Sequence, residues 1–260
     1  MGRISKAFEN KKAFIAFVTG GDPDISTTEA LIPQMAAAGA DLIEIGIPFS
    51  DPIAEGAVIQ AADARALQAG TTTDQLFDMV RRVRKKVDIP LVFMTYMNPI
   101  YTYGTERFVG QCAACGIDGI IVPDVPFEEQ AEVSGACAAA GVAVISMVAP
   151  ASGERISMIA RQAKGFLCCA ASCGTQEVHS GSAAAVKEMV DRAKEVSDIP
   201  CAVGYGIATP QQARAMAAVS DGAIAGSAIV KLIAQHKKNC IGPVCRYVKE
   251  MKAAVAAAAV

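Results

Sequence analysis

The chain has 260 residues, of which 52% are hydrophobic, and its 24 basic and 26 acidic residues give a formal net charge of −2. A chain of this length and apolar content can bury a large core, either as one large α/β barrel or as two ordinary domains. The basic residues are scattered rather than clustered, so the composition excludes the electrostatic footprint of a protein that binds nucleic acid or an anionic membrane.

The N-terminal segment predicts a short helix, with Ile4 and Phe8 on its apolar side, and no targeting signal. Residues 1–10 (MGRISKAFEN) lack the uninterrupted apolar stretch of a signal peptide. No later run approaches the roughly 18 apolar residues that a membrane span requires. We therefore expect a soluble, cytoplasmic protein.

The next residues introduce a pattern that recurs along the chain, in which an apolar strand, a glycine-containing turn and a helix follow one another. Residues 13–19 (AFIAFVT) predict a buried strand, and a helix is expected from about residue 26 to residue 38. Gly39 predicts the end of that helix, and Gly116 and Gly141 end two later helices directly before apolar strands. The pattern predicts alternating strands and helices.

Eight apolar runs predict eight strands in a single domain of residues 1–260. The runs are continuous rather than alternating with polar residues, which is typical of parallel strands covered on both faces. We therefore predict an α/β fold, a single (β/α)8 TIM barrel with an extra N-terminal helix and long loops after strands 2 and 6. An open doubly wound sheet is the alternative, disfavoured because no Gly-x-Gly-x-x-Gly follows the first strand. The strand centres are Phe17, Glu44, Phe93, Ile121, Ile145, Leu167, Val203 and Ile224.

Glu44 is a carboxylate inside an apolar strand. With a side-chain period of two, it shares a face with Leu42 and opposes Ile43, so it must point into the space that the strands enclose. Burial disfavours the charged form of a carboxylate, so we expect a raised pKa that lets Glu44 give and take a proton near neutral pH. The loop that follows carries Asp51 and Glu55, before an extra helix at residues 59–70.

Two late loops predict a phosphate site. Residues 203–207 (VGYGI) leave the seventh strand with glycines that let backbone N–H groups approach an anion. Residues 224–230 (IAGSAIV) leave the eighth strand into a helix whose free N–H groups and dipole favour a phosphate. In barrels these two loops are the usual phosphate site, although an ordinary strand-to-helix turn would contain the same glycines.

The other polar residues have simpler interpretations that the sequence leaves open. Asp51 belongs to a Ser-Asp-Pro turn, where an aspartate usually caps its own loop, and Glu55 is equally compatible with a solvated loop carboxylate. No Ser/His/acid arrangement for acyl transfer can be assigned. The candidate acid-base groups are therefore carboxylates, which suits proton transfer or carbon–carbon cleavage.

The nine cysteines predict neither disulfides nor a metal site. An odd number of cysteines fits reduced thiols used as small hydrophobic residues. Cys112 and Cys115 form one Cys-x-x-Cys pair inside a predicted helix, and no second pair stands at a matching spacing. A further group, Cys168, Cys169 and Cys173, lies in one strand and the loop after it, but His179 and His236 are the only histidines, so a metal centre would have few ligands.

Six motifs are spread over nearly the whole chain, and the most specific is residues 44–52 (EIGIPFSDP). The others are residues 17–23 (FVTGGDP), 94–100 (MTYMNPI), 122–126 (VPDVP), 203–207 (VGYGI) and 221–231 (DGAIAGSAIVK). Through these motifs the chain resembles the alpha subunits of tryptophan synthase. The resemblance implies a (β/α) barrel lyase of aromatic amino-acid biosynthesis, which cleaves indole-3-glycerol phosphate into indole and glyceraldehyde 3-phosphate by a retro-aldol step.

The same resemblance implies the cofactors and partners. No cofactor is expected in this subunit, because the pyridoxal phosphate of the family belongs to a beta subunit that receives the indole. The expected assembly is an alpha2beta2 heterotetramer, with neither nucleic acid nor a membrane as a partner.

The resemblance also implies roles for residues at matching positions. Glu44 is expected to be the principal acid-base, and Glu55 the second carboxylate, which draws on the indole N–H as charge develops there. The expected substrate-binding residues are Phe17, Tyr96, Ile121 and Tyr205 around the indole, with Gly206, Gly226 and Ser227 around the phosphate. The expected contacts with the beta subunit are Asp51, Asn98, Pro99 and Pro126.

The chain departs from the family pattern at three places. Glu55 stands where the family usually has aspartate, and Cys168 stands where it has tyrosine. Residues 174–177 (GTQE) replace a Gly-Val-Thr-Gly motif, which puts Glu177 where a glycine would offer its N–H to the phosphate. One hypothesis is a working lyase subunit with an altered lid, and the alternative is a weakened barrel that acts mainly as binding partner and allosteric effector of the beta subunit. A free-standing indole lyase is a third.

Overall fold

A computed structural model describes residues 2–171 and 183–259 of the chain. Within these residues nine strands form one parallel sheet, in the order β5-β4-β3-β2-β1-β9-β8-β7-β6. The strands are β1 (Ala13–Thr19), β2 (Leu42–Gly46), β3 (Leu91–Met94), β4 (Gly119–Ile121), β5 (Ala143–Val144), β6 (Met147–Val148), β7 (Leu167–Ala170), β8 (Cys201–Gly204) and β9 (Gly222–Ala225).

The ring of strands closes through one short stretch of chain. β5 and β6 are the two ends of the sheet order, yet only Ile145 and Ser146 separate them in sequence. The Ile145 N–H donates to the Ile120 carbonyl over 2.8 Å, and the Ser146 carbonyl accepts from the Cys168 N–H over 3.0 Å. The fifth strand of the barrel is therefore divided into two pieces that stay bonded to both neighbours. This arrangement confirms the predicted TIM barrel, and it replaces the continuous strand expected at Ile145.

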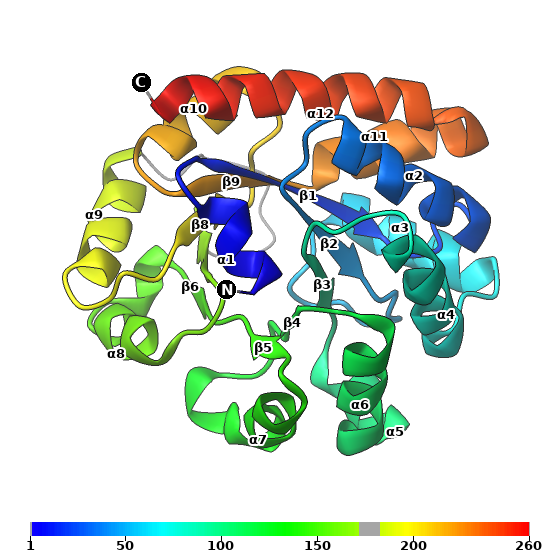
Figure 1. Ribbon diagram of the computed structural model, residues 1–260, viewed down its shortest axis with the longest axis horizontal. Coiled ribbons are helices and arrows are strands. Elements are labelled where there is room, and N and C mark those ends of the chain that lie inside the picture. The colour runs from blue at the N-terminus through cyan, green and yellow to red at the C-terminus, as the bar shows by residue number, and fades with distance from the viewer. Residues whose placement is uncertain (1, 172–182, 260) are drawn as a thin grey trace.

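Helices surround the ring, and helix α1 lies over its centre (Figure 1). Phe8 of α1 packs on Phe166, directly before β7, with the ring centroids 5.7 Å apart, so α1 covers the end of the barrel where the strands begin. None of the helices in the described residues is long and apolar enough to cross a membrane. The helices are α1 (Arg3–Phe8), α2 (Ile25–Ala37), α3 (Ala57–Gln68), α4 (Thr73–Arg84), α5 (Met97–Tyr103), α6 (Thr105–Cys115), α7 (Ala131–Ala140), α8 (Arg155–Gln162), α9 (Ala183–Lys194), α10 (Pro210–Ala218), α11 (Ser227–His236) and α12 (Ile241–Ala256), with short 3₁₀ turns η1 (Phe127–Glu129), η2 (Pro150–Ser152), η3 (Lys237–Asn239) and η4 (Ala257–Ala259).

Glycines end the helices largely as the sequence predicts. Gly116 and Gly141 cap α6 and α7 in the left-handed conformation, with φ of 89° and 72°. Ala38 caps α2, and Gly39 follows it with φ of 112°. The extra helix after the Glu44 strand is α3, which begins at Ala57, two residues before the predicted start. Most of the long loop expected after the sixth strand lies outside the described residues.

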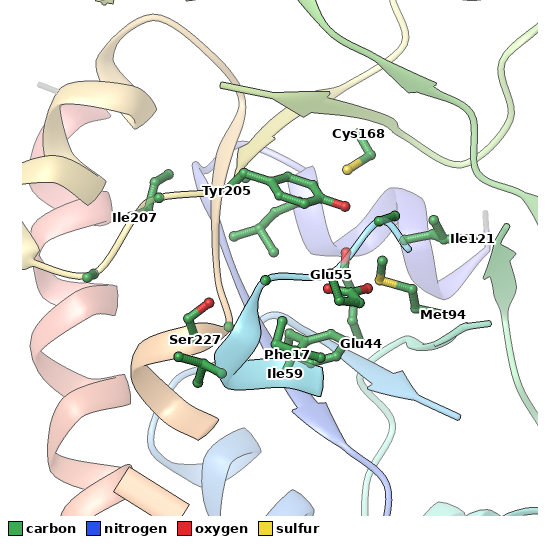
Figure 2. A pocket seen from close by; sticks show the side chains of 18 of the residues that line it. Phe17, Glu44, Glu55, Ile59, Met94, Ile121, Cys168, Tyr205, Ile207 and Ser227 are labelled. Carbon is green, nitrogen blue, oxygen red and sulfur yellow. The ribbon is translucent and has the colours of Figure 1, made fainter. Parts of the chain in front are cut away.

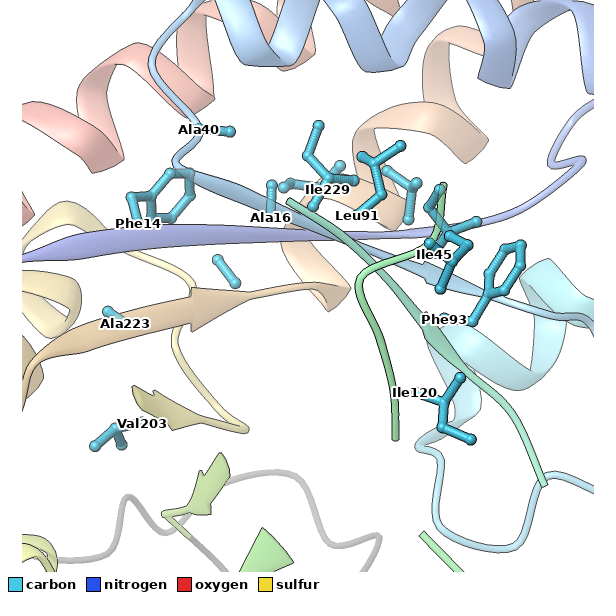
Figure 3. Close-up of a cluster of buried hydrophobic side chains, with 14 of the residues drawn as sticks. Phe14, Ala16, Ala40, Ile45, Leu91, Phe93, Ile120, Val203, Ala223 and Ile229 are labelled. Atoms are coloured by element: carbon cyan, nitrogen blue, oxygen red, sulfur yellow. The ribbon is translucent and has the colours of Figure 1, made fainter. Parts of the chain in front are cut away.

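The alternation of side chains along the strands divides the apolar residues into two clusters. Ile43 and Ile45 of β2 face outward and join the large cluster between the sheet and the helices, which Figure 3 shows around Phe93 and Ile229. Leu42, which precedes Ile43 and has the opposite parity, joins a smaller cluster inside the ring. Glu44 has the same parity as Leu42 and therefore also faces inward.

Phe77 of α4 is a central contact of the outer cluster. Its ring is buried and makes edge contacts with Phe93, Tyr103 and Phe108, at centroid distances of 5.4–5.8 Å. We predict that Phe77→Ala lowers the free energy of unfolding by about 3–5 kcal/mol, because it removes buried apolar area and leaves a cavity. Urea denaturation measures the change, and Phe77→Leu should lose markedly less. A loss below about 1 kcal/mol for the alanine variant would contradict this packing.

Candidate active site

A cavity of about 520 Å³ opens where the strands end, and the inward-facing residues of the barrel line it (Figure 2). Its volume suits a small organic ligand. Its acidic end contains Glu44 and Glu55, and its other end is formed by the loops after β8 and β9. The lining residues are Phe17, Glu44, Ala54, Glu55, Gly56, Ala57, Val58, Ile59, Met94, Ile121, Met147, Cys168, Gly204, Tyr205, Gly206, Ile207, Ala208, Ile224, Gly226, Ser227 and Lys231.

Glu44 is held by the register of the sheet. In the β1–β2 pair it lies beside Phe17, and in the β2–β3 pair beside Val92. The side chain is 4% exposed, and its Oε1 atom has no hydrogen-bond partner in the described residues. Burial first, and then the nearby charge of Glu55, raise the pKa of Glu44 from its ordinary 4.5 to about 8. At neutral pH the group is a protonated acid aimed at the cavity.

Glu55 reaches the same space from the loop between β2 and α3. The loop is fastened by the Ala54 N–H, which donates to the Tyr96 hydroxyl over 3.0 Å, and by the Gln60 side chain, which donates to the Glu55 carbonyl over 2.8 Å. The Glu55 side chain is 4% exposed. Burial first, and then the charge of Asp63, raise its pKa to about 7. Glu55 therefore changes charge close to neutral pH, below the pH at which Glu44 does.

The opposite end of the cavity offers donors to an anion. Tyr205 and Gly206 both have positive φ, 67° and 80°, which turns the chain sharply after β8. Gly226 caps α11, whose first residue, Ser227, lies at the helix terminus where free N–H groups and the helix dipole favour negative charge. Lys231, one helical turn further on, is the only basic residue among the described residues that line the cavity.

The structure brings most of the predicted substrate-binding residues together. Phe17, Ile121, Tyr205, Gly206, Gly226 and Ser227 all line the cavity with Glu44 and Glu55. Figure 2 shows the Tyr205 hydroxyl directed toward the carboxylates, with Ser227 on the other side. Tyr96 is buried but is not among the lining residues. Its hydroxyl accepts from Ala54 and its ring packs on Phe49, with centroids 5.4 Å apart, so it supports the Glu55 loop.

The four residues predicted to contact a partner follow strands β2, β3 and β4: Asp51 and Pro126 lie on loops, and Asn98 and Pro99 lie in α5. Asp51, Asn98 and Pro126 are exposed and Pro99 is partly exposed, and none of these four lines the cavity. Two large apolar side chains are also exposed on these segments: Ile53, after β2, is 73% exposed and Tyr101, in α5, is 76% exposed.

Several cavity residues were not predicted from the sequence. Ile59, Met94 and Met147 line the space through packing between distant segments, which no local pattern reports. Lys231 could have been predicted to lie near the phosphate site, because it follows Ser227 by four residues and the two side chains therefore share one face of a helix. Asp63, buried in α3 near Glu55, lacked any such signal.

Seven of the eight cysteines in the described residues are buried, and Cys245 is partly buried. Cys112 and Cys115 are both buried in α6, and the Cys115 thiol contacts the Cys112 carbonyl. The described residues contain no group of three or more His, Cys, Asp or Glu side chains that could hold a metal ion. Cys168 lines the cavity, and burial raises its pKa well above the ordinary value. Cys173, residues 174–177 with Glu177, and His179 lie outside the described residues.

Comparisons with known proteins agree on one family. The family model described as tryptophan synthase alpha chain matches residues 4–256. The tryptophan synthase alpha chain of Lacticaseibacillus casei is 40% identical over 255 residues, which covers 98% of this chain and 96% of the relative. That of Geobacter sulfurreducens is 43% identical over 262 residues, which covers 98% and 99%.

Solved structures give the same result. Tryptophan synthase subunit alpha from Legionella pneumophila superposes with a TM-score of 0.88 at 35% identity, covering 98% of both chains. A chain of Mycobacterium tuberculosis tryptophan synthase superposes with a TM-score of 0.89 at 31% identity, again covering 98% of both chains.

The raised pKa of Glu44 predicts how stability depends on pH. Between about pH 4.5 and 8 the folded chain keeps a proton on Glu44 that the unfolded chain has released, so the free energy of unfolding should fall as the pH rises. Glu44→Gln removes this titration. From pH 5 to pH 8, wild type should therefore lose more stability than the variant, by on the order of 3 kcal/mol.

Urea denaturation at a series of pH values measures this difference. Glu250→Gln changes an exposed carboxylate of α12 and is the matched control. Identical pH slopes for wild type and Glu44→Gln would show that Glu44 titrates normally in the folded chain.

Proposed function

Because the chain belongs to the tryptophan synthase alpha chain family, whose reaction is the cleavage of indole-3-glycerol phosphate, we propose that Glu44 and Glu55 carry out this cleavage in the barrel cavity. The observation that carries the proposal is that two buried carboxylates and the glycine-containing loops after β8 and β9 line one cavity. The lyase reaction serves tryptophan biosynthesis and yields indole and glyceraldehyde 3-phosphate.

Glu44 moves the protons. Its carboxylic acid protonates C3 of the indole ring, which turns the ring into an indoleninium with positive charge at nitrogen. The resulting carboxylate then accepts the proton of the hydroxyl on the adjacent glycerol carbon. The carbon–carbon bond breaks, its electron pair returns to the ring as indole, and the hydroxyl carbon becomes the aldehyde. A pKa of about 8 supports the first step, because Glu44 then carries its proton at neutral pH.

Glu55 stabilises the charge that appears on the ring nitrogen. In its ionised form, Glu55 accepts a hydrogen bond from the indole N–H. A negative charge in a water-poor cavity stabilises the cationic intermediate more than the neutral substrate. A pKa of about 7 supports this role, because Glu55 ionises at lower pH than Glu44. One site thus holds a protonated and an ionised carboxyl group together, a division of roles that different environments produce.

The two ends of the cavity suit the two ends of the substrate. The indole packs among Phe17, Met94 and Ile121, all buried and apolar. The phosphate binds at Gly206, Gly226 and Ser227, where free backbone N–H groups and the dipole of α11 attract it. Lys231 adds the one positive charge among the described lining residues, and it has no ion pair within the described part of the chain.

The beta subunit of tryptophan synthase is the proposed partner. Asp51, Asn98 and Pro126 are exposed and Pro99 is partly exposed, and the segments after β2 and β3 also expose Ile53 and Tyr101, so polar and apolar side chains are available to a partner. Docking there would let indole pass directly to the partner, which would carry the pyridoxal phosphate in an alpha2beta2 assembly. The alpha chain itself contributes only side chains and backbone N–H groups to its own reaction.

We predict that Glu44→Gln lowers the rate of indole release from indole-3-glycerol phosphate by at least about a hundredfold. The amide keeps the shape of the side chain but can neither donate nor accept the transferred proton, a contribution of roughly 10²–10⁴ in rate. A colorimetric or fluorescence assay of indole measures the change with and without a beta subunit.

Asp51→Asn in the isolated chain is the control for this experiment, because Asp51 is exposed and does not line the cavity. Its rate should stay close to that of wild type. Undetectable cleavage by the wild-type chain, combined with tight binding of a beta subunit, would reject the lyase proposal.

We predict that Lys231→Gln raises KM for indole-3-glycerol phosphate about tenfold and changes kcat little. The lysine attracts the phosphate equally in the substrate and in the transition state, and such uniform binding affects KM alone. The effect should shrink at high salt, because mobile ions screen an exposed charge. Lys249→Gln, which changes an exposed lysine of α12, should leave KM unchanged. An equal KM in both variants would contradict the assignment.

A further inference from the structure

Asp63 is a buried carboxylate that the reaction described above does not use. It belongs to the middle of α3 and is 5% exposed. A buried charge needs hydrogen bonds or an opposite charge, and an aspartate without either is strongly disfavoured. The basic neighbour on the same helix, Arg65, is already committed elsewhere: it binds both oxygens of Asp22, at 2.9 and 2.7 Å.

The hydrogen bonds of Asp63 join three segments of the barrel mouth. The Thr19 hydroxyl, at the end of β1, donates to Asp63 over 3.4 Å. The Phe49 backbone N–H, in the loop after β2, also donates to this carboxylate. That loop continues to Glu55, and it starts from the strand that carries Glu44. Asp63 therefore fastens the loop at its first part, while Tyr96 fastens it beside Glu55 through the Ala54 N–H.

The negative charge of the same carboxylate also affects the ionisation of Glu55. Burial raises the pKa of Asp63 to about 7, although the bonds from Phe49 and Thr19 favour its ionised form. The charge of Asp63 in turn raises the pKa of Glu55. Two neighbouring carboxylates do not ionise independently, so the first charge of the pair opposes the second. The other titratable or charged groups around the pair are Glu44 on β2, Asp22 after β1, Arg65 on α3, Tyr96 before α5, Cys168 on β7 and Tyr205 after β8.

We propose that Asp63 is a positioning residue of the lyase site, which anchors the loop bearing Glu55 and so fixes the place of that carboxylate in the cavity. The proposal rests on the function proposed above, since it assigns Glu55 a role in the reaction. Asp63 touches no substrate. It acts through Glu55, because an ionised Asp63 holds the proton on Glu55 to higher pH and makes the Glu55 anion a stronger acceptor once it forms.

Asp63→Asn removes the negative charge of the side chain but keeps its ability to anchor the loop. The amide oxygen still accepts from Phe49 and Thr19, but the negative charge is lost. In ¹³C NMR titrations of side-chain carboxyl carbons, the Glu55 midpoint should fall by about half a pH unit or more relative to wild type. The acid limb of the kcat/KM profile should move in the same direction. An unchanged Glu55 midpoint would overturn the charge coupling. Glu250→Gln, remote and exposed, is the control and should shift neither readout.

Asp63→Ala removes the anchor as well. Beyond the shift seen in Asp63→Asn, amide hydrogen exchange at residues 48–55 should accelerate, and kcat should fall about tenfold to a hundredfold, because small displacements of a catalytic group are costly. Equal exchange and equal kcat in the alanine and asparagine variants would overturn the anchoring role.

The wild-type chain provides a test that needs no variant. Coupled carboxylates give titration curves with two steps, so the Asp63 signal should show a second inflection at the Glu55 midpoint. Single independent steps for both residues would overturn the charge coupling even if Asp63→Asn failed to fold. A wild-type chain without indole release would instead reject the proposed lyase function, while the NMR shift would still support the coupling.

Discussion

The burial of Glu44 inside the ring of strands is the constraint on which the rest of the site depends. A free carboxylate in an apolar interior loses its hydration, and Oε1 of Glu44 has no hydrogen-bond partner in the described residues to replace it. The side chain is instead held by strand pairing, because the β1–β2 register fixes Glu44 beside Phe17. The fold tolerates the group by keeping it protonated, and a protonated acid facing a cavity is what carbon protonation requires.

Phe17 lies between the two ends of the cavity, one with Glu44 and the other with the loop after β9. The sheet order puts β1 between β2, which carries Glu44, and β9, which leads to Gly226. The Phe17 ring needs room on both sides: a Cβ added to Gly46 would lie 2.8 Å from it, and one added to Gly226 would lie 3.2 Å from its Cβ and ring. The two glycines therefore leave room for one aromatic ring in the cavity wall between Glu44 and the proposed phosphate site at Gly226.

The barrel, and the inward direction of Glu44, could be predicted because both follow from local patterns: helix, glycine and strand repeat along the chain, and side chains alternate along β2. The details of the site depend on contacts that no local pattern reports. The Tyr96 hydroxyl meets the Ala54 N–H across 42 residues, and Thr19 meets Asp63 across 44. The division of the fifth strand at Ile145 likewise depends on how neighbouring strands close the ring.

Stability and reactivity require the same protonation state of Glu44. Burial favours the neutral acid, so the form that is more stable in the fold is also the form that would start the proposed reaction. The cost arises after the first proton transfer, when Glu44 becomes an anion close to Glu55. In the proposed mechanism the cationic ring offsets both charges at that moment, and removal of the hydroxyl proton then restores the neutral acid. The unfavourable dianionic site therefore exists only while the positive intermediate stabilises it, which favours completion of the cleavage over release of an intermediate.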